Sequence, residues 1–165
     1  MNFLEYSLHW VKGEILEGWI ILISGLITLF CSFCLWYFGT TANAKSLILP
    51  MIVVGTLFLA MASSMVYSNN KRLPAMQQSY QENPMQFAQN EKKRVEDFQI
   101  LYPISLAVST VCFILTLIFF WFTNNQTLYA VGIPLSIFGI ALIVIDYFSK
   151  ERASIYYEQI LNYLK

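Results

Sequence analysis

The residues with the clearest chemical potential are acids and bases at the ends of long apolar segments. Glu14 and Glu17 precede one apolar run, and Asp146 closes another, with no other Asp, Glu, Lys or Arg between Asp97 and Asp146. An ionisable group inside a membrane is costly, so it normally faces a partner or a water-filled cavity and marks a binding or proton-exchange site. We therefore predict a polar binding cluster made of Glu14, Glu17, Tyr67, Lys71, Arg94, Tyr102 and Asp146.

Within this cluster, Asp146 is expected to face a partner and not lipid. The nearest bases in the predicted topology are Arg94 and Lys71, and Tyr67 or Tyr102 could donate a hydrogen bond to the carboxylate. The hypothesis is an ion pair between Asp146 and one of these bases. The alternative is an interfacial charge that reaches into water.

Signatures of catalysis, metal binding and nucleic-acid binding are missing from the sequence. It contains no GxSxG motif and no glycine-rich phosphate loop. His9 is the one histidine, and no Glu stands three residues before it, as a four-helix di-metal site requires. The run Lys92-Lys93-Arg94 is short and sits beside acids, which suits lipid headgroups better than nucleic acid. We therefore predict no catalytic residue, metal site, cofactor or nucleic-acid partner, and lean towards a protein that is not an enzyme.

Composition indicates that these groups are positioned by membrane helices. Hydrophobic residues make up 57% of the chain and charged residues 12%, against about 25% in soluble domains. Four apolar runs lie at about 19–38, 47–67, 100–122 and 128–148. A helix of about 20 residues is ~30 Å long, the hydrocarbon thickness of a bilayer, and lipid leaves the backbone no other partner. The sequence predicts one all-α domain over 1–165, an integral membrane four-helix bundle.

The basic residues indicate how this bundle lies in the membrane. Nine of the ten Lys and Arg residues fall before the first run, between the second and third, or after the fourth; only Lys45 lies elsewhere. Because basic residues are enriched on the cytoplasmic side, both termini and the 68–98 connection are predicted to be cytoplasmic. The expected location is the plasma membrane, the inner membrane in a bacterium.

Helical extensions are expected on that side. Residues 2–17 are amphipathic and could lie on the inner leaflet before turning into the first span. Asn83 and Pro84 predict the start of a helix that runs into span three, and the 149–165 tail should continue span four. The connection 68–98 is otherwise read as a loop.

The two halves also resemble each other. Each has a Trp at the end of one span and a Pro-x4-Gly motif that opens the next, at Pro50 and Pro134. This predicts a 2+2 internal repeat, although two hydrophobic hairpins could share such features by chance.

Small and hydroxyl residues form a stripe along each span at helical spacing. In span two the stripe is Thr56, Ala60, Ser63, Tyr67 and Lys71, and in span three it is Tyr102, Ser105, Ser109, Cys112 and Thr116. Such stripes are typical of close helix packing, and they could also line a narrow polar path. They carry no charge over most of their length, which argues against a hydrated pore within one chain.

Three functional hypotheses follow. The first is a small transport or channel-type homo-oligomer with its path between protomers. The second is a non-enzymatic interaction subunit, suggested by a Tyr-rich tail that we expect to be exposed at Tyr156, Tyr157 and Tyr163. The third is a membrane enzyme acting on lipid or quinone with Glu14, Glu17 or Asp146 as base. Expected partners are membrane lipids and either a second copy or another membrane protein.

Overall fold

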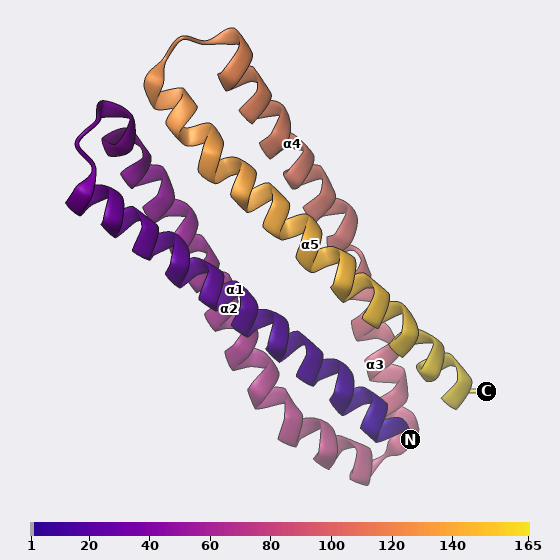
Figure 1. The fold of residues 1–165 in the computed structure, drawn as a ribbon. Helices are drawn as coiled ribbons and strands as arrows, with labels where there is room; N and C mark the ends of the chain where they lie inside the picture. Colours follow the sequence, from indigo (N-terminus) through magenta and orange to yellow (C-terminus); the bar gives the residue numbers. More distant parts are fainter. Residues whose placement is uncertain (1) are drawn as a thin grey trace.

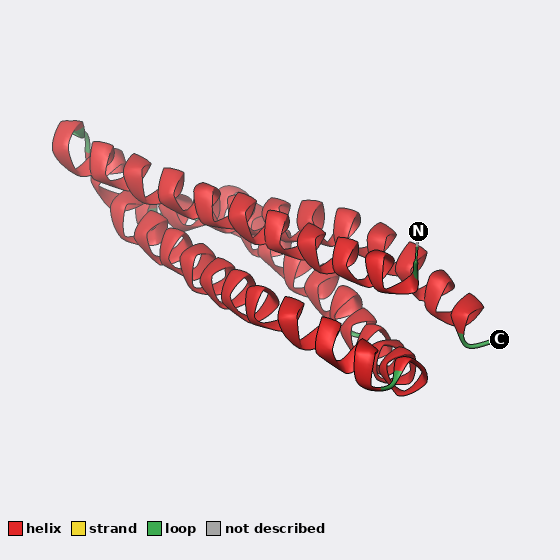
Figure 2. Cartoon of the chain, turned by 90° about the horizontal axis from the view of Figure 1, so that it is seen from below, coloured by secondary structure: helices red, strands yellow, loops and turns green. Residues whose placement is uncertain are grey.

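The fold consists of helices joined by short turns. A computed structural model describes residues 2–165, and every regular element in that range is helical (Figure 2). In chain order these are α1 (Phe3–Phe38), α2 (Ala42–Glu82), α3 (Pro84–Gln99), α4 (Leu101–Phe122) and α5 (Gln126–Tyr163). The all-α prediction is confirmed.

Four helical rods are long and apolar enough to cross a membrane: α1, α2, α5, and α3 together with α4. The break between α3 and α4 is a single residue, Ile100. Pro103 explains it, because a proline ring clashes with the carbonyl four residues earlier, here Gln99, where α3 ends. The helix predicted to run unbroken from Asn83 into span three is therefore interrupted once.

The two ends of the molecule differ in what they hold. Figure 1 shows both chain ends and the α2–α3 connection at one end, and the α1–α2 and α4–α5 turns at the other. We call these the terminal end and the turn end. The predicted pairing of the chain ends with the 68–98 segment is confirmed.

Helices α1 and α2 form one hairpin, and α4 and α5 form a second (Figure 1). Most close contacts lie within the hairpins, and α5 makes the contacts that join them, to both α1 and α2. Within residues 2–165, the backbone of α4 comes close to neither α1 nor α2. The structure is therefore a helical bundle of two paired hairpins that are joined mainly through α5.

The two hairpins share a register. Ser32 in α1 donates to the Ile48 carbonyl at 3.0 Å. The Thr116 hydroxyl in α4 shares its one proton between the Gly132 carbonyl at 3.1 Å and the Cys112 carbonyl of its own helix at 2.8 Å. Thr116 lies 84 positions after Ser32, and Gly132 lies 84 positions after Ile48. The same spacing separates the helix ends Phe38 and Phe122 and the capping residues Thr41 and Asn125. These correspondences support the predicted repeat.

Pro50 and Pro134 do not open their helices, as the sequence suggested. Each lies well inside a helix, because α2 begins at Ala42 and α5 at Gln126. Side-chain caps explain the earlier starts. Thr41 accepts from the Ala44 N–H, and Asn125 accepts from the Thr127 N–H.

Long extensions build a separate hydrophobic core at the terminal end. Residues 2–17 do not turn onto a membrane surface as expected but continue α1 without a break. Val11, Val95, Ala153 and Ile160 are fully buried there, so α1, α3 and α5 pack around a common centre. The segment after residue 67, expected as a loop, continues α2 to Glu82. The tail continues α5, as predicted.

Candidate functional site

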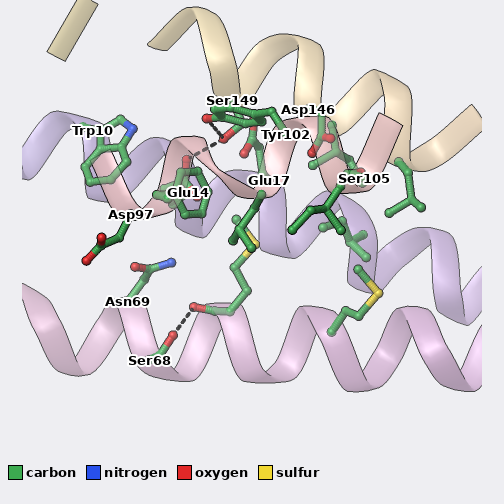
Figure 3. A pocket seen from close by; sticks show the side chains of 18 of the residues that line it. Trp10, Glu14, Glu17, Ser68, Asn69, Asp97, Tyr102, Ser105, Asp146 and Ser149 are labelled. Carbon is green, nitrogen blue, oxygen red and sulfur yellow. Dashed lines mark hydrogen bonds between the residues drawn. The ribbon is translucent and has the colours of Figure 1, made fainter. Parts of the chain in front are cut away.

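An open cavity of about 770 Å³ lies between the hairpins and takes lining residues from all five helices. This volume is in the range of pockets that bind small molecules. The half nearer the turn end is apolar, and the half nearer the terminal end is polar (Figure 3). The apolar lining consists of Ile21, Met61, Met65, Ile104, Val108, Phe138, Leu142 and Ile145.

The cavity ends in an apolar layer between the hairpins. Phe138 of α5 stacks on Phe58 of α2 with ring centroids 5.7 Å apart, and Ile21, Val54 and Ala62 complete a buried cluster around them. Water has no polar partner in such a layer. The polar side chains of the cavity therefore do not connect to the turn end.

A hydrogen-bonded chain crosses the polar half. Ser149 donates to Glu14 Oε1 at 3.2 Å, and the Tyr102 hydroxyl lies 3.3 Å from Ser149 Oγ (Figure 3). All three side chains are buried, and they come from α5, α1 and α4. The chain thus ties both hairpins to one carboxylate.

Two buried carboxylates share one arginine. Arg152 forms an ion pair with Glu17, and its Nη2 lies 3.6 Å from Glu14 Oε1. Among residues 2–165, Glu17 Oε2 has no hydrogen-bond partner, so Arg152 engages only one oxygen of this carboxylate. With both acids ionised, the group of three carries one surplus negative charge.

Burial shifts the titration of these acids, which precede the apolar run 19–38. Burial raises the pKa of Glu14, against the opposing effects of the Ser149 hydrogen bond and the Arg152 charge. Burial and the neighbouring Glu14 charge raise the pKa of Glu17 to about 7. Because a buried charge without full pairing is disfavoured, the surplus charge readily takes up a proton near neutral pH.

A second network holds the terminal side of the cavity. Arg94 pairs with Glu91 and stacks over Trp10, with its guanidinium carbon 4.4 Å from the ring centroid. The Tyr156 hydroxyl donates to Glu91 Oε2 at 2.8 Å and lies 2.8 Å from Ser7 Oγ. Burial and the Glu91 charge raise the pKa of Tyr156, so it remains a neutral donor.

Arg72 projects into the cavity from α2. It bonds to Asn69 Oδ1 at 3.2 Å, and no acid lies within ion-pair distance of it in residues 2–165. Burial, and then the charge of Arg94, lower the pKa of its guanidinium, which stays protonated at neutral pH.

The predicted ion pair of Asp146 is wrong. Across the described chain, Asp146 pairs with no base, because Arg94 is held by Glu91 and Lys71 is exposed on α2. Tyr102 bonds to Ser149 and not to Asp146. Asp146 is half-buried and lines the cavity beside Ser105, so it does not face lipid alone either.

Five of the seven predicted cluster residues line this cavity, and two from α2 do not. Tyr67 is 72% exposed and Lys71 is also exposed, as is the rest of the predicted span-two stripe. The face that packs inward instead carries Val54, Phe58, Ala62, Met65, Asn69, Arg72 and Met76. The prediction that small hydroxyl residues form the packed face of α2 is therefore wrong, because larger apolar side chains pack inward there.

Sequence reasoning missed several polar residues at the site: Trp10, Asn69, Arg72, Asp97, Ser149 and Arg152. For two of them a signal existed. Asn69 and Arg72 continue the stripe of Val54, Phe58, Ala62 and Met65 at steps of three and four. For Arg152 no signal existed, because its reach to α1 depends on how the hairpins pair.

The arrangement suits binding and proton exchange. In the part of the chain that the structure describes, no three His, Cys, Asp or Glu residues lie close enough together to hold a metal ion. Carboxylates, arginines and aromatic rings at one end of an apolar cavity can hold the polar head of an amphipathic molecule. No family model, curated protein or solved structure matches this chain.

Proposed function

We propose that this protein is a multi-pass membrane carrier for a small amphipathic molecule, inserted with its terminal end in the cytoplasm. The orientation rests on charge, because nine of the ten bases lie in the segments of the terminal end and only Lys45 lies near the turn end. A lipid environment also accounts for the many exposed large apolar side chains on α1, α2, α4 and α5.

The cavity between the hairpins is the observation that carries this proposal. It takes lining residues from both α2 and α4, whose described backbones do not come close to each other, so an amphipathic molecule could enter sideways from the bilayer. Its apolar half would hold the body of the molecule, and its polar half would hold the head. Carriers often place binding sites at the interface between two repeats.

A carrier fits the site better than an open channel does. The Phe58–Phe138 layer closes the polar half from the turn end, so passage requires the hairpins to move relative to each other. This proposal places the substrate site within one chain and not between protomers, where the sequence led us to expect a path. Assembly as a homo-oligomer stays a prediction.

Neither alternative has comparable support. The interaction hypothesis rested on the missing catalytic signatures and on an exposed Tyr-rich tail. Tyr163 is exposed as predicted, but Tyr156 is buried, and Tyr157 is half-buried and bonds to Glu96. A membrane enzyme would use the same cavity. It would differ from a carrier by changing its ligand chemically.

Uptake into vesicles tests the carrier. Purified protein in liposomes is given three dansyl amides that share one body and carry a quaternary ammonium, a hydroxyl or a carboxylate head. We expect protein-dependent uptake of at least one. Met65→Trp should block it by filling the apolar half of the cavity. Met85→Trp is the matched control, because Met85 is 52% exposed on α3 and does not line the cavity.

Two outcomes would overturn the carrier. If no probe crosses faster than in protein-free vesicles, the proposal fails. If a probe is recovered in altered chemical form, the enzyme hypothesis replaces it. Uptake that Met65→Trp and Met85→Trp leave equally intact would show that the cavity is not the route.

A further inference from the structure

The charges around the cavity do not balance at its polar half. Arg94 is neutralised by Glu91, and Arg152 neutralises one of Glu14 and Glu17. One negative charge of the Glu14–Glu17 pair remains, and Asp146 adds another without an ion-pair partner. The remaining lining charges, Arg72 and Asp97, are of opposite sign. A bound positive charge would therefore be favoured in the polar half, and a bound negative charge would be disfavoured.

An unpartnered polar atom points to a ligand independently of this charge count. Glu17 is 6% exposed, and its Oε2 atom has no hydrogen-bond partner although it lines the cavity (Figure 3). Ser105, on the opposite wall, lies within hydrogen-bonding reach of Asp146. Buried polar atoms normally have partners, so the Glu17 acceptor left open towards the cavity marks a place for a ligand.

The groups that face Glu17 come from every helix packed around it. Glu14 lies one turn away on α1, and Arg152 and Asp146 approach from α5. The other titratable groups around the polar half are Arg72 on α2, Arg94 and Asp97 on α3, and Tyr102 on α4. Among residues 2–165, Arg152 is the one base within ion-pair distance of Glu17, and Glu17 Oε2 stays open to one further positive group.

The apolar half sets the remaining requirement. Met61 and Met65 line it from α2, and Ile104 and Val108 line it from α4. Methionine side chains adapt to ligands of varied shape, and this half offers no polar partner. A small hydrated cation would leave this half empty, whereas a cation bearing apolar groups would fill it.

Building on the proposed carrier function, we propose that the ligand is a lipophilic monocation, and that its positive charge takes the place of one proton on the Glu14–Glu17 pair. The step balances in charge, because one cation enters and one proton leaves to solvent. The cationic centre lies between Glu17 and Asp146, and the apolar groups lie against Met61, Met65 and Phe138. Arg72 also lines the cavity, and its positive charge disfavours the binding of a second cation.

Binding of two matched ions tests this ligand class. The full chain in lipid nanodiscs is titrated calorimetrically with tetraphenylphosphonium and with tetraphenylborate, which have the same shape and opposite charge. We expect the phosphonium to bind and the borate not to. Glu17→Gln should weaken phosphonium binding about tenfold or more, because the surplus charge is lost. Glu158→Gln, at an exposed position on α5 outside the cavity, should bind as the unmodified chain does.

Proton release gives a second readout. Titration in buffers with different ionisation enthalpies should show close to one proton released per phosphonium at about pH 6, where a Glu17 with a pKa of about 7 is mostly protonated. In Glu17→Gln this release should disappear. That variant should still fold, because Glu14 remains to pair with Arg152.

The possible failures are distinguishable. If the borate binds as tightly as the phosphonium, or if Glu17→Gln leaves binding and proton release unchanged, the cationic class is wrong. Uptake of the hydroxyl or carboxylate dansyl probe would then still support the carrier. If no dansyl probe is taken up while the phosphonium binds with proton release, the cation site stands and the carrier fails.

Discussion

The two hairpins are built on one backbone plan, but they differ in what they place against the cavity. Positions 84 residues apart carry equivalent hydrogen bonds, helix ends and caps. At three such pairs the first hairpin has an apolar residue where the second has a polar one: Ile21 and Ser105, Ala62 and Asp146, Met65 and Ser149. The same backbone arrangement therefore presents apolar side chains in the first hairpin and polar side chains in the second.

The difference extends to the close approach of the helices. Gly25 and Gly55 let α1 and α2 come together, whereas Ser109 stands at the position equivalent to Gly25. The acids Glu14 and Glu17 belong to the first hairpin, but the base that neutralises them, Arg152, belongs to the second. The equivalent position in the first hairpin is Ser68. The two halves thus depend on each other electrostatically as well as by packing.

Removing Arg152 should break this dependence with the largest effect. Arg152→Met leaves two buried carboxylates without the one base in residues 2–165 that lies within ion-pair distance of them, and breaking a buried ion pair from one side costs about 3–5 kcal/mol. The free energy of unfolding, measured by denaturing-detergent titration at neutral pH, should fall by about that amount. Lys150→Met, at an exposed position nearby on α5, is the control and should change little.

A double variant sharpens the assignment. Adding Glu17→Gln to Arg152→Met removes one of the two stranded charges and should recover part of the lost stability. If the double variant is no more stable than the single one, the loss came from packing of the arginine stem and not from stranded charge.

The pH dependence of stability should be smaller, because in the unmodified protein Arg152 stays in place. Burial and the Glu14 charge raise the pKa of Glu17 to about 7, so the folded protein binds more protons than the unfolded chain between its ordinary value of 4.5 and about 7. The contribution of Glu17 to the free energy of unfolding is therefore fully present below pH 4.5 and is lost as the pH rises through about 7. Glu17→Gln should remove this fall. A stability curve that rises over the same range would contradict the assignment.

The packing of the two hairpins can be compared at Gly25 and Gly139, which both lie where two helices approach closely but are not equivalent positions of the repeat. A methyl group added at Gly25 would lie 3.0 Å from Phe58 Cβ and 3.1 Å from the Gly55 carbonyl oxygen. At Gly139 the nearest atom, Cys112 Cβ, is 3.3 Å away, with a Phe113 ring that can move. Gly25→Ala should therefore cost about 1–3 kcal/mol, and Gly139→Ala less. Equal losses in thermal midpoint would show that the hairpins pack alike.

The positions of the four long helices, and the location of most acidic residues at the cavity, could be predicted from the sequence. Runs free of charge predict the four spans, because lipid excludes unpaired ions, and the Asn83–Pro84 pair predicts the start of α3. Glu14, Glu17 and Asp146 were placed at one cavity because each stands where an apolar run meets charged sequence. The spacing of apolar and charged residues along the chain determines such helix positions without reference to the rest of the fold.

The inward face of α2 could not be read in the same way. Tyr67 and Lys71 were expected inside because small hydroxyl residues precede them at helical spacing, yet Phe58 and Met65 face the other hairpin. In lipid both stripes are tolerated outside, so composition does not decide between them. Which base forms an ion pair with which acid also depends on how the two hairpins pack together. For this reason the predicted ion pair of Asp146 was wrong.

The smallest effect should come from the hydrogen bond that the hairpins share. Ser32→Ala and Thr116→Val each remove a side-chain donor to the backbone of the neighbouring helix. Interhelical hydrogen bonds of this kind contribute about 0.6 kcal/mol on average in a membrane protein, so both variants should lose about this much stability. The Ser136 hydroxyl shares its one proton between Thr116 Oγ1 and the Gly132 carbonyl, so in Thr116→Val it can donate to Gly132 alone and no polar group is stranded. Equal losses in the two variants would support a repeat in energy as well as in geometry. A loss confined to Ser32→Ala would mean that the two hydrogen bonds are equivalent in geometry but contribute unequally to stability. The second hairpin would then be stabilised by other contacts, such as those of its polar residues at the cavity.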